Sequence, residues 1–186
     1  MAVTYRRNPI PAGRHRLSAL SWWFASAVAC AAVSPPALLS DQELRDPAFV
    51  AGWLAREGST ADRKAAARFH AHGLKDKEAA NWSAATKAFG ESAVRYPAPE
   101  VLLDYVDAKL RMLGPVRARR GPRIDEVRAD MADALGLYEA ALAANGVTAT
   151  LSAAQARRAA QHVACMKEYL ATRAPGDCAP VRYFDR

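Results

Sequence analysis

The chain has 186 residues, of which 51% are hydrophobic, and a formal net charge of +7. Four of its 26 basic residues lie in the first 29 positions, which hold no acidic residue, so the rest of the chain has 22 basic against 19 acidic side chains. This near balance argues against a nucleic-acid partner, because such proteins need a concentrated basic surface. Alanine is the commonest residue and long β-branched runs are absent, which favours helices throughout one domain of ordinary size.

The N-terminal residues have the three parts of a secretory signal peptide. Four arginines between positions 6 and 16 precede an apolar stretch at 17–28, which ends in Ala27-Val28-Ala29-Cys30. The apolar stretch is shorter than the roughly 20 residues of a membrane-spanning helix. We therefore expect residues 1–29 to be a signal peptide that is removed before Cys30.

The residues at 27–30 also resemble the lipobox of bacterial lipoproteins, although Ala27 stands where that motif usually has leucine. The resemblance implies a lipid on the thiol of Cys30. It also implies an outer-membrane location in a Gram-negative bacterium, because Ala31 rather than aspartate follows the cysteine. We predict a bacterial periplasmic protein that is anchored to the membrane by this lipid. The alternatives are a soluble periplasmic protein, an uncleaved anchor and a cytosolic protein.

After the leader, residues 30–45 contain Pro35-Pro36 and are expected to form a tether to a helical domain at 46–186. Apolar spacing, capping residues and prolines predict six antiparallel helices with short connections. These helices span 46–57, 59–78, 82–95, 100–114, 124–145 and 150–172, and a tail follows at 173–186. Residues 115–123 hold two prolines, a glycine and four arginines, and are expected to interrupt the helices.

Export permits a disulfide between Cys165 and Cys178. The helix from Cys165 to residue 173 would rise by roughly 12 Å, and the five residues after it can reach back up to about 17 Å. Pro175-Gly176 supplies a turn between them. We predict this disulfide, with two unpaired thiols as the alternative.

The second and third predicted helices carry small and aromatic residues at fixed spacing. Phe69 and Gly73 lie on the first of them, Trp82, Ala85 and Phe89 lie on the second, and Pro97 follows. A glycine permits a close approach of the partner helix, an alanine fits where the helices cross, and an aromatic ring fills the space toward the next pair. This pattern resembles the tetratricopeptide repeat (TPR).

The resemblance continues over residues 60–146. Leu103 lies 34 residues after Phe69, whereas Asp107 breaks the small-residue pattern. Ala134 and Tyr138 repeat the alanine and aromatic spacing after an insertion of 15 residues. The resemblance implies an all-α fold, with antiparallel helix pairs stacked as a short TPR-like α-solenoid and the 150–172 helix as its C-terminal cap. An unrelated helical bundle with the same apolar stripes is the alternative.

A TPR-like fold implies an adaptor or scaffold that holds a peptide or helix of a partner protein, here in the bacterial cell envelope. The first helix of each pair would line the concave face, and its candidate contact residues are His72, Lys75, Asp76, Asp104, Asp107, Lys109 and Arg111. The interrupting stretch adds Arg117, Arg119, Arg120 and Arg123 as candidates for an anionic surface, with a plain solvated loop as the alternative.

No pattern in the sequence points to catalysis, a cofactor or a metal. His70 and His72 lie two residues apart on a predicted helix and face opposite sides, so they cannot share one ion. His162 and Cys165 share a face, but Cys165 has a disulfide partner and no third group is evident that would orient the pair. We predict that the protein is not an enzyme. The alternative is an envelope enzyme or enzyme subunit with thiol or disulfide chemistry at Cys165 and Cys178.

Overall fold

The computed structural model describes residues 38–120, 124–172 and 178–184. All regular structure within these ranges is helical, which confirms the predicted all-α class. The elements are the 3-10 helix η1 (Glu43–Arg45) and the α-helices α1 (Pro47–Glu57), α2 (Arg63–Glu78), α3 (Trp82–Ala93), α4 (Pro99–Arg120), α5 (Ile124–Thr148), α6 (Ala153–Thr172) and α7 (Ala179–Arg182). The predicted signal peptide, Cys30 and Arg123 lie outside the described residues.

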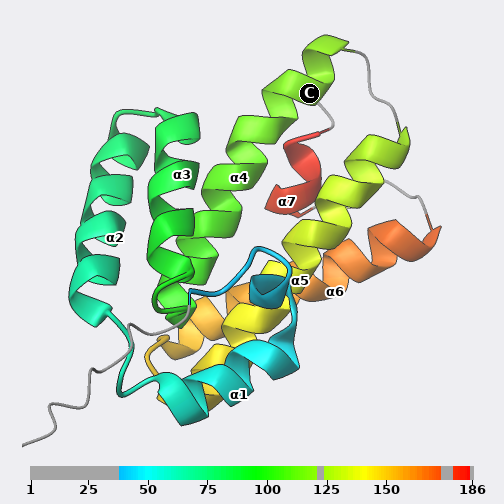
Figure 1. Cartoon of the computed structure of the whole chain (residues 1–186). Helices are drawn as coiled ribbons and strands as arrows, with labels where there is room; N and C mark the ends of the chain where they lie inside the picture. The colour runs from blue at the N-terminus through cyan, green and yellow to red at the C-terminus, as the bar shows by residue number, and fades with distance from the viewer. Residues whose placement is uncertain (1–37, 121–123, 173–177, 185–186) are drawn as a thin grey trace, which may run out of the picture. The chain divides into compact units, whose positions relative to one another are not determined.

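Each helix from α2 to α5 packs against the next one along the chain, and these helices alternate in direction (Figure 1). α6 packs on α5, and the first helix, α1, also packs on α5. In this series of neighbouring helices, every second member is therefore α2, α4 or α6.

Side chains just before the helices fix where they begin. The Asp46 carboxylate accepts hydrogen bonds from two backbone amides of α1, and Asn81 caps α3 through the amide of Ala84. The amide of Ala65 donates to Asp62, so α2 begins at Arg63 and not at residue 59 as predicted. An aspartate is as good an N-cap as the serine and threonine that precede it, and the sequence offered all three.

The interface between α2 and α3 is built on Gly73 and Phe89. The Phe89 ring is fully buried, and a Cβ atom added at Gly73 would lie 2.5 Å from two of its carbon atoms. Ala85 is also fully buried, and the hydroxyl of buried Ser92 donates to the carbonyl oxygen of Ala66 at 2.8 Å. Gly73 thus provides the close approach that its position in the sequence predicted.

The residues before α1 belong to the folded domain, so the prediction of a tether as far as residue 45 is wrong for them. Leu39 and Leu44 are buried, and the Leu39 amide donates to the carbonyl oxygen of Val94 at 2.9 Å. Arg45 forms an ion pair with Asp133 of α5. Leu44 lies within η1, which turns its side chain inward, and Leu39 is held by its backbone hydrogen bond to Val94. The composition of this stretch did not reveal either contact.

α4 continues through Gly114 and Pro115 to Arg120, so the predicted interruption after residue 114 is wrong. Contacts from other elements offset the cost of the proline. Arg117 forms ion pairs with Glu126 and, at 2.7 Å, with Asp130, both from α5. Residues 115–120, which were expected to interrupt the helices, therefore lengthen α4.

Replacing Pro115 by alanine is expected to raise the free energy of unfolding by about 2 kcal/mol. Proline in a helix interior is about 3 kcal/mol less favourable than alanine, and the greater freedom of the unfolded alanine chain returns up to about 1 kcal/mol. Urea unfolding followed by circular dichroism measures this gain. Pro99→Ala is the comparison and should bring no gain, because proline costs nothing at the first helical position and the Pro99 ring is fully buried in the core. An equal gain at both positions would contradict the interpretation.

α5 ends at Thr148, three residues later than predicted, and Gly146 lies inside the helix and is not its C-cap. The chain leaves the helix at Ala149, whose φ of 52° lies in the left-handed region. The side chain of Asn145 accepts a hydrogen bond from the amide of Leu151 at 2.8 Å and fixes the turn into α6.

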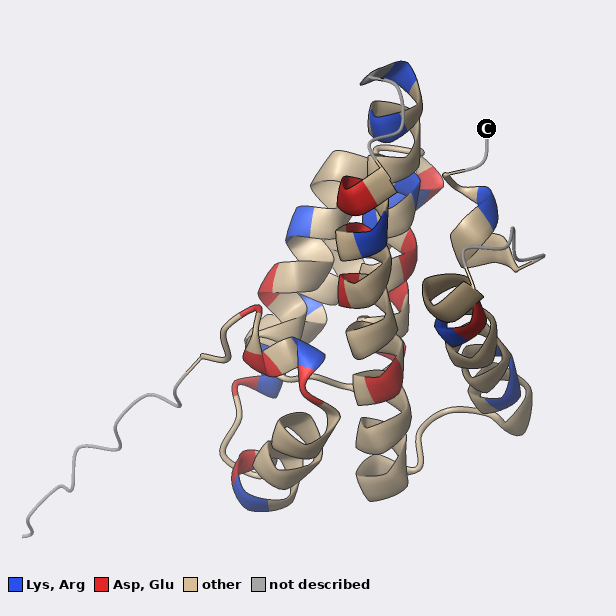
Figure 2. Ribbon diagram, turned by 90° about the vertical axis from the view of Figure 1, so that its right-hand side faces the viewer, with Lys and Arg blue, Asp and Glu red and all other residues tan. Residues whose placement is uncertain are grey.

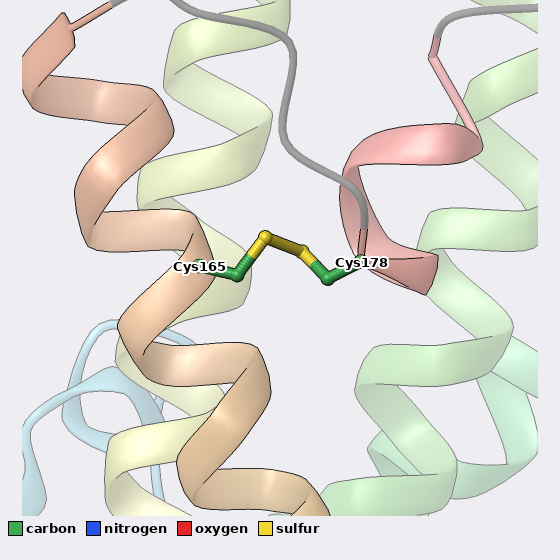
Figure 3. Close-up of a disulfide and its surroundings, with 2 residues drawn as sticks. All are labelled: Cys165 and Cys178. Atoms are coloured by element: carbon green, nitrogen blue, oxygen red, sulfur yellow. A yellow bond between two sulfur atoms is a disulfide. The ribbon is translucent and has the colours of Figure 1, made fainter.

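Cys165 of α6 and Cys178, directly before α7, form a disulfide in agreement with the prediction (Figure 3). Their Cα atoms are 6.3 Å apart. Pro180, Val181 and Phe184 beyond this bond are buried. The last described residues, 178–184, are therefore part of the packed domain.

Candidate functional site

A cavity of about 480 Å³ opens between α4, α6 and α7 and is called the groove below. Its lining residues come from five helices and the turn after α7: Lys77 of α2, Leu103, Asp104, Asp107 and Arg111 of α4, Tyr138 of α5, Gln155, Arg158, Ala159 and His162 of α6, Ala179 of α7, and Tyr183. α2, α4 and α6, the alternate members of the helix series, contribute most of these residues.

The sequence of α4 gives this helix two different faces. Leu102, Val106 and Leu110 recur at a spacing of four and are fully buried in the core. Asp104, Asp107 and Arg111 recur at three and four on another face. Because the apolar face is held against the neighbouring helices, the charged face is directed into the groove.

Asp104 is held by two side chains of α2. His70 Nε2 lies 2.9 Å from one carboxylate oxygen, and Lys77 Nζ donates to the other at 2.7 Å. Burial alone would raise the pKa of Asp104, but the hydrogen bonds and charges of His70 and Lys77 outweigh it and hold that pKa below its usual value. Asp104 therefore stays ionised at neutral pH and fastens α2 to α4.

Asp107 is the centre of a second cluster. It accepts from Arg111 Nε at 3.0 Å and from the Tyr183 hydroxyl at 3.1 Å, and Lys77 Nζ lies 3.8 Å away. The Arg111 guanidinium also lies 4.8 Å from the centre of the Trp82 ring and 5.1 Å from that of Tyr183. Arg111 therefore makes one ionic contact and two cation–π contacts, of which the one with Trp82 lies outside the groove.

The wall formed by α6 has a different character. His162 packs edge-on against Tyr138, with 5.2 Å between ring centres, and its Nδ1 atom is buried without a hydrogen-bond partner. Arg158, one turn before it, is exposed and makes no ion pair with any described residue. This wall therefore presents a cation and a ring nitrogen that form no ion pair or hydrogen bond with the part of the chain that the structure describes.

The burial of His162 should make stability depend on pH. Burial lowers its pKa, the charge of Arg158 adds to this effect, and Asp107 opposes it. The folded protein therefore binds fewer protons than the unfolded chain just below pH 6.5, and stability is lost as the pH falls from about 7 toward 5. His162→Gln is expected to reduce that loss in urea unfolding. His72→Gln, at an exposed position outside the groove, should leave it unchanged, and equal effects of both variants would contradict this assignment.

The structure brings together only part of the predicted contact set. Asp104, Asp107 and Arg111 share the groove. Lys109 faces away from it and lies 3.6 Å from Asp133 of α5. Three of the four α4 candidates thus line the groove, and their contact with a partner stays a prediction.

The candidates on α2 lie outside the groove. His72 and Asp76 line a separate cavity between α2 and α3, and Lys75 is exposed. Lys77 lines the groove in their place, and His70 holds Asp104 from the same side of α2, since residues seven apart lie on one face of a helix and residue 72 lies on the opposite one. Gly73 indicates which face of α2 packs on α3, but the face that is turned toward α4 is decided by the packing of the folded chain.

The arginine-rich stretch is not a free basic loop in its described part. Arg117 is neutralised by Glu126 and Asp130. Arg119 donates to the carbonyl oxygen of Pro115 at 3.1 Å and lines a second cavity beside the groove. Nothing is described for the side chain of Arg120. Figure 2 shows basic and acidic segments interspersed along the helices, without a large area of one sign in this view.

Within the described ranges, no cluster of three histidine, cysteine or acidic residues is arranged to hold a metal ion. None of the described helices is long and apolar enough to cross a membrane. No protein-family model, curated protein or solved structure matches this chain. The groove itself therefore supplies the argument for function.

Proposed function

We propose that the protein is an exported adaptor of the bacterial cell envelope that binds a segment of a partner protein in the groove. The observation that carries this proposal is the groove's position. It is lined by α2, α4 and α6, which are the first helices of the two predicted pairs and the capping helix. In stacked helix pairs these alternate helices form the concave binding surface.

The packing of the pairs supports a TPR-like arrangement. The fit of Gly73 against Phe89 is the close contact expected within a repeat. Ala134 and Tyr138 are buried on α5, as Ala85 and Phe89 are on α3. Two features depart from a regular solenoid: α1 packs on α5, and α4 is lengthened. The proposed repeat is therefore a short one in which α1 and η1 cover the far side of α5.

The groove has the composition of a recognition surface. Its charged groups on α2 and α4 are positioned by ion pairs before any ligand arrives, which lowers the ordering cost of binding. It also combines an aromatic ring, a guanidinium and an unused cation at Arg158, which are residue types that are enriched at binding sites. We propose that the partner meets this surface in the periplasm and that a lipid on Cys30 anchors the adaptor to the membrane.

A charge reversal in the groove tests the proposal. Arg158→Glu changes the groove wall, and Arg157→Glu changes the neighbouring exposed arginine, which does not line the groove. Affinity capture from the envelope of the producing bacterium, quantified by mass spectrometry, should recover a partner with the wild type and with Arg157→Glu and lose it with Arg158→Glu. A set of captured proteins that is the same for all three would contradict a role of the groove. Intact mass of the mature chain tests the lipid on Cys30 separately.

A further inference from the structure

The last described residues, 178–184, are here called the C-terminal clip. The disulfide fixes the start of the clip to α6, and α7 then lies beside α4 (Figures 1 and 3). Val181 and Phe184 are buried, so the clip is seated and does not merely trail along the surface. It crosses the groove at Tyr183.

The seat of the clip on α4 depends on a glycine. A Cβ atom added at Gly114 would lie 2.2 Å from the carbonyl oxygen of Tyr183, closer than any real contact permits. On the other side of Tyr183, its hydroxyl donates to Asp107 at 3.1 Å and its ring lies over the Arg111 guanidinium. α4 thus recognises the clip through a backbone contact, a hydrogen bond and a cation–π contact.

Tyr183 separates two cavities. Together with Arg111 it lines both the groove and the second cavity, which measures about 410 Å³ and is bounded by Trp82, Pro115 and Arg119. The two cavities lie along α4 from Leu103 to Arg119, a length of roughly 24 Å. Since Tyr183 lines both cavities, we expect its removal to join them into one trough with room for about seven residues of extended chain.

We propose that the C-terminal clip occupies the place of a tyrosine-bearing peptide segment of the partner, and that reduction of the Cys165–Cys178 disulfide releases the clip so that this segment can bind. The inference rests on the proposed adaptor function. The segment would place its tyrosine hydroxyl on Asp107 and its ring on Arg111, as Tyr183 does now, and would extend into both cavities.

The chemical step needs a dithiol reductant, such as a periplasmic thiol–disulfide exchange protein supplies. One thiolate of the reductant attacks a sulfur of the Cys165–Cys178 bond and forms a mixed disulfide, and the other half-cystine leaves as a thiolate and takes up a proton. The second thiol of the reductant then displaces the remaining half-cystine. Two electrons and two hydrogens pass to Cys165 and Cys178, and the reductant becomes the disulfide.

A labelled peptide with the sequence of residues 178–186, with serine in place of Cys178, is the probe. Fluorescence anisotropy measures its binding to the oxidised full chain, to the chain reduced with a dithiol, and to Tyr183→Ala, whose clip can no longer compete fully. We expect affinity to rise at least about tenfold on reduction, because a fixed intramolecular competitor is loosened, and to be highest for Tyr183→Ala. The Cys165→Ser/Cys178→Ser variant should bind the peptide with the affinity of the reduced chain, and the dithiol should not change that affinity.

Two further comparisons test the mode of binding. Gly114→Ala in the double-serine variant should abolish peptide binding, whereas Gly146→Ala, in a helix with open space around it, should leave it intact. A peptide with phenylalanine in place of tyrosine should bind about tenfold more weakly, since it lacks a hydrogen bond to a charged group. Equal affinity for the oxidised and reduced chains, or binding that Gly114→Ala does not affect, would overturn the inference. If the inference about the clip fails in this way but Arg158→Glu still loses a captured partner, the proposed adaptor function stands without the inference.

Discussion

Replacing Phe89 by alanine is expected to lower the free energy of unfolding by about 3–5 kcal/mol. The ring is fully buried and fills the space between α2 and α3, where Gly73 leaves no side chain that could move into the cavity. Urea unfolding followed by circular dichroism measures the loss. Leu74→Ala, on the exposed side of α2, serves as the control and should cost less than about 1 kcal/mol. A similar loss for both variants would mean that the α2–α3 interface does not rest on this contact.

The same contact predicts that Gly73→Ala lowers the free energy of unfolding in the wild type but raises it in the Phe89→Ala background. In the wild type, Gly73→Ala places a methyl group against the Phe89 ring, and overpacking of this kind costs about 1–3 kcal/mol. In the Phe89→Ala background the clash is absent, and the higher helix propensity of alanine should raise stability by up to about 1 kcal/mol. A double-mutant cycle measures the coupling, and additive effects would contradict the assigned contact.

Removing the Cys165–Cys178 disulfide is expected to lower the free energy of unfolding by about 3 kcal/mol. The bond closes a loop of 13 residues in sequence, and a cross-link of that size restricts the unfolded chain by about this amount. Loss of the bond also loosens the buried residues of the C-terminal clip, so the helical domain is left with fewer fixed contacts. Urea unfolding of the oxidised wild type and of the Cys165→Ser/Cys178→Ser variant measures the difference.

Adding a dithiol provides the control for this measurement. The reduced wild type should unfold at the urea concentration of the double-serine variant, and the variant itself should not respond. A loss below about 1 kcal/mol in both would mean that α6 and α7 hold together without the bond.

The sequence alone was sufficient to predict the features that depend on local chemistry. Asp46 with Pro47 marks a helix start and Gly73 marks a close helix contact, because both follow from the shapes of the residues themselves. Phe89, which was expected to fill the space toward the next pair, packs against Gly73 within the pair instead. The disulfide was predictable because the reach of a short chain limits where Cys178 can lie. All three are short-range arguments that need no knowledge of distant segments.

The sequence failed where a distant segment decides the outcome. A proline usually ends a helix, yet α4 continues past Pro115. It does so because Glu126 and Asp130 of α5 form ion pairs with Arg117. The groove residues on α2 were chosen from the wrong face, since only the packing of α3 decides which face of α2 is turned toward α4. Tyr183 was missed altogether, because nothing in its own neighbourhood indicates that it lies beside residues more than seventy positions earlier.

The contact at Gly114 constrains how this protein can diverge over time. It is made with the main-chain oxygen of Tyr183, so a different side chain at position 183 gives no relief to a larger residue at 114. The side chains of the clip could be substituted one by one without a change in its backbone path. Gly114 could not be substituted, because any larger residue would meet the main chain of the clip. Among descendants of a common ancestor we therefore expect position 114 to remain glycine after the identity of the last residues has drifted.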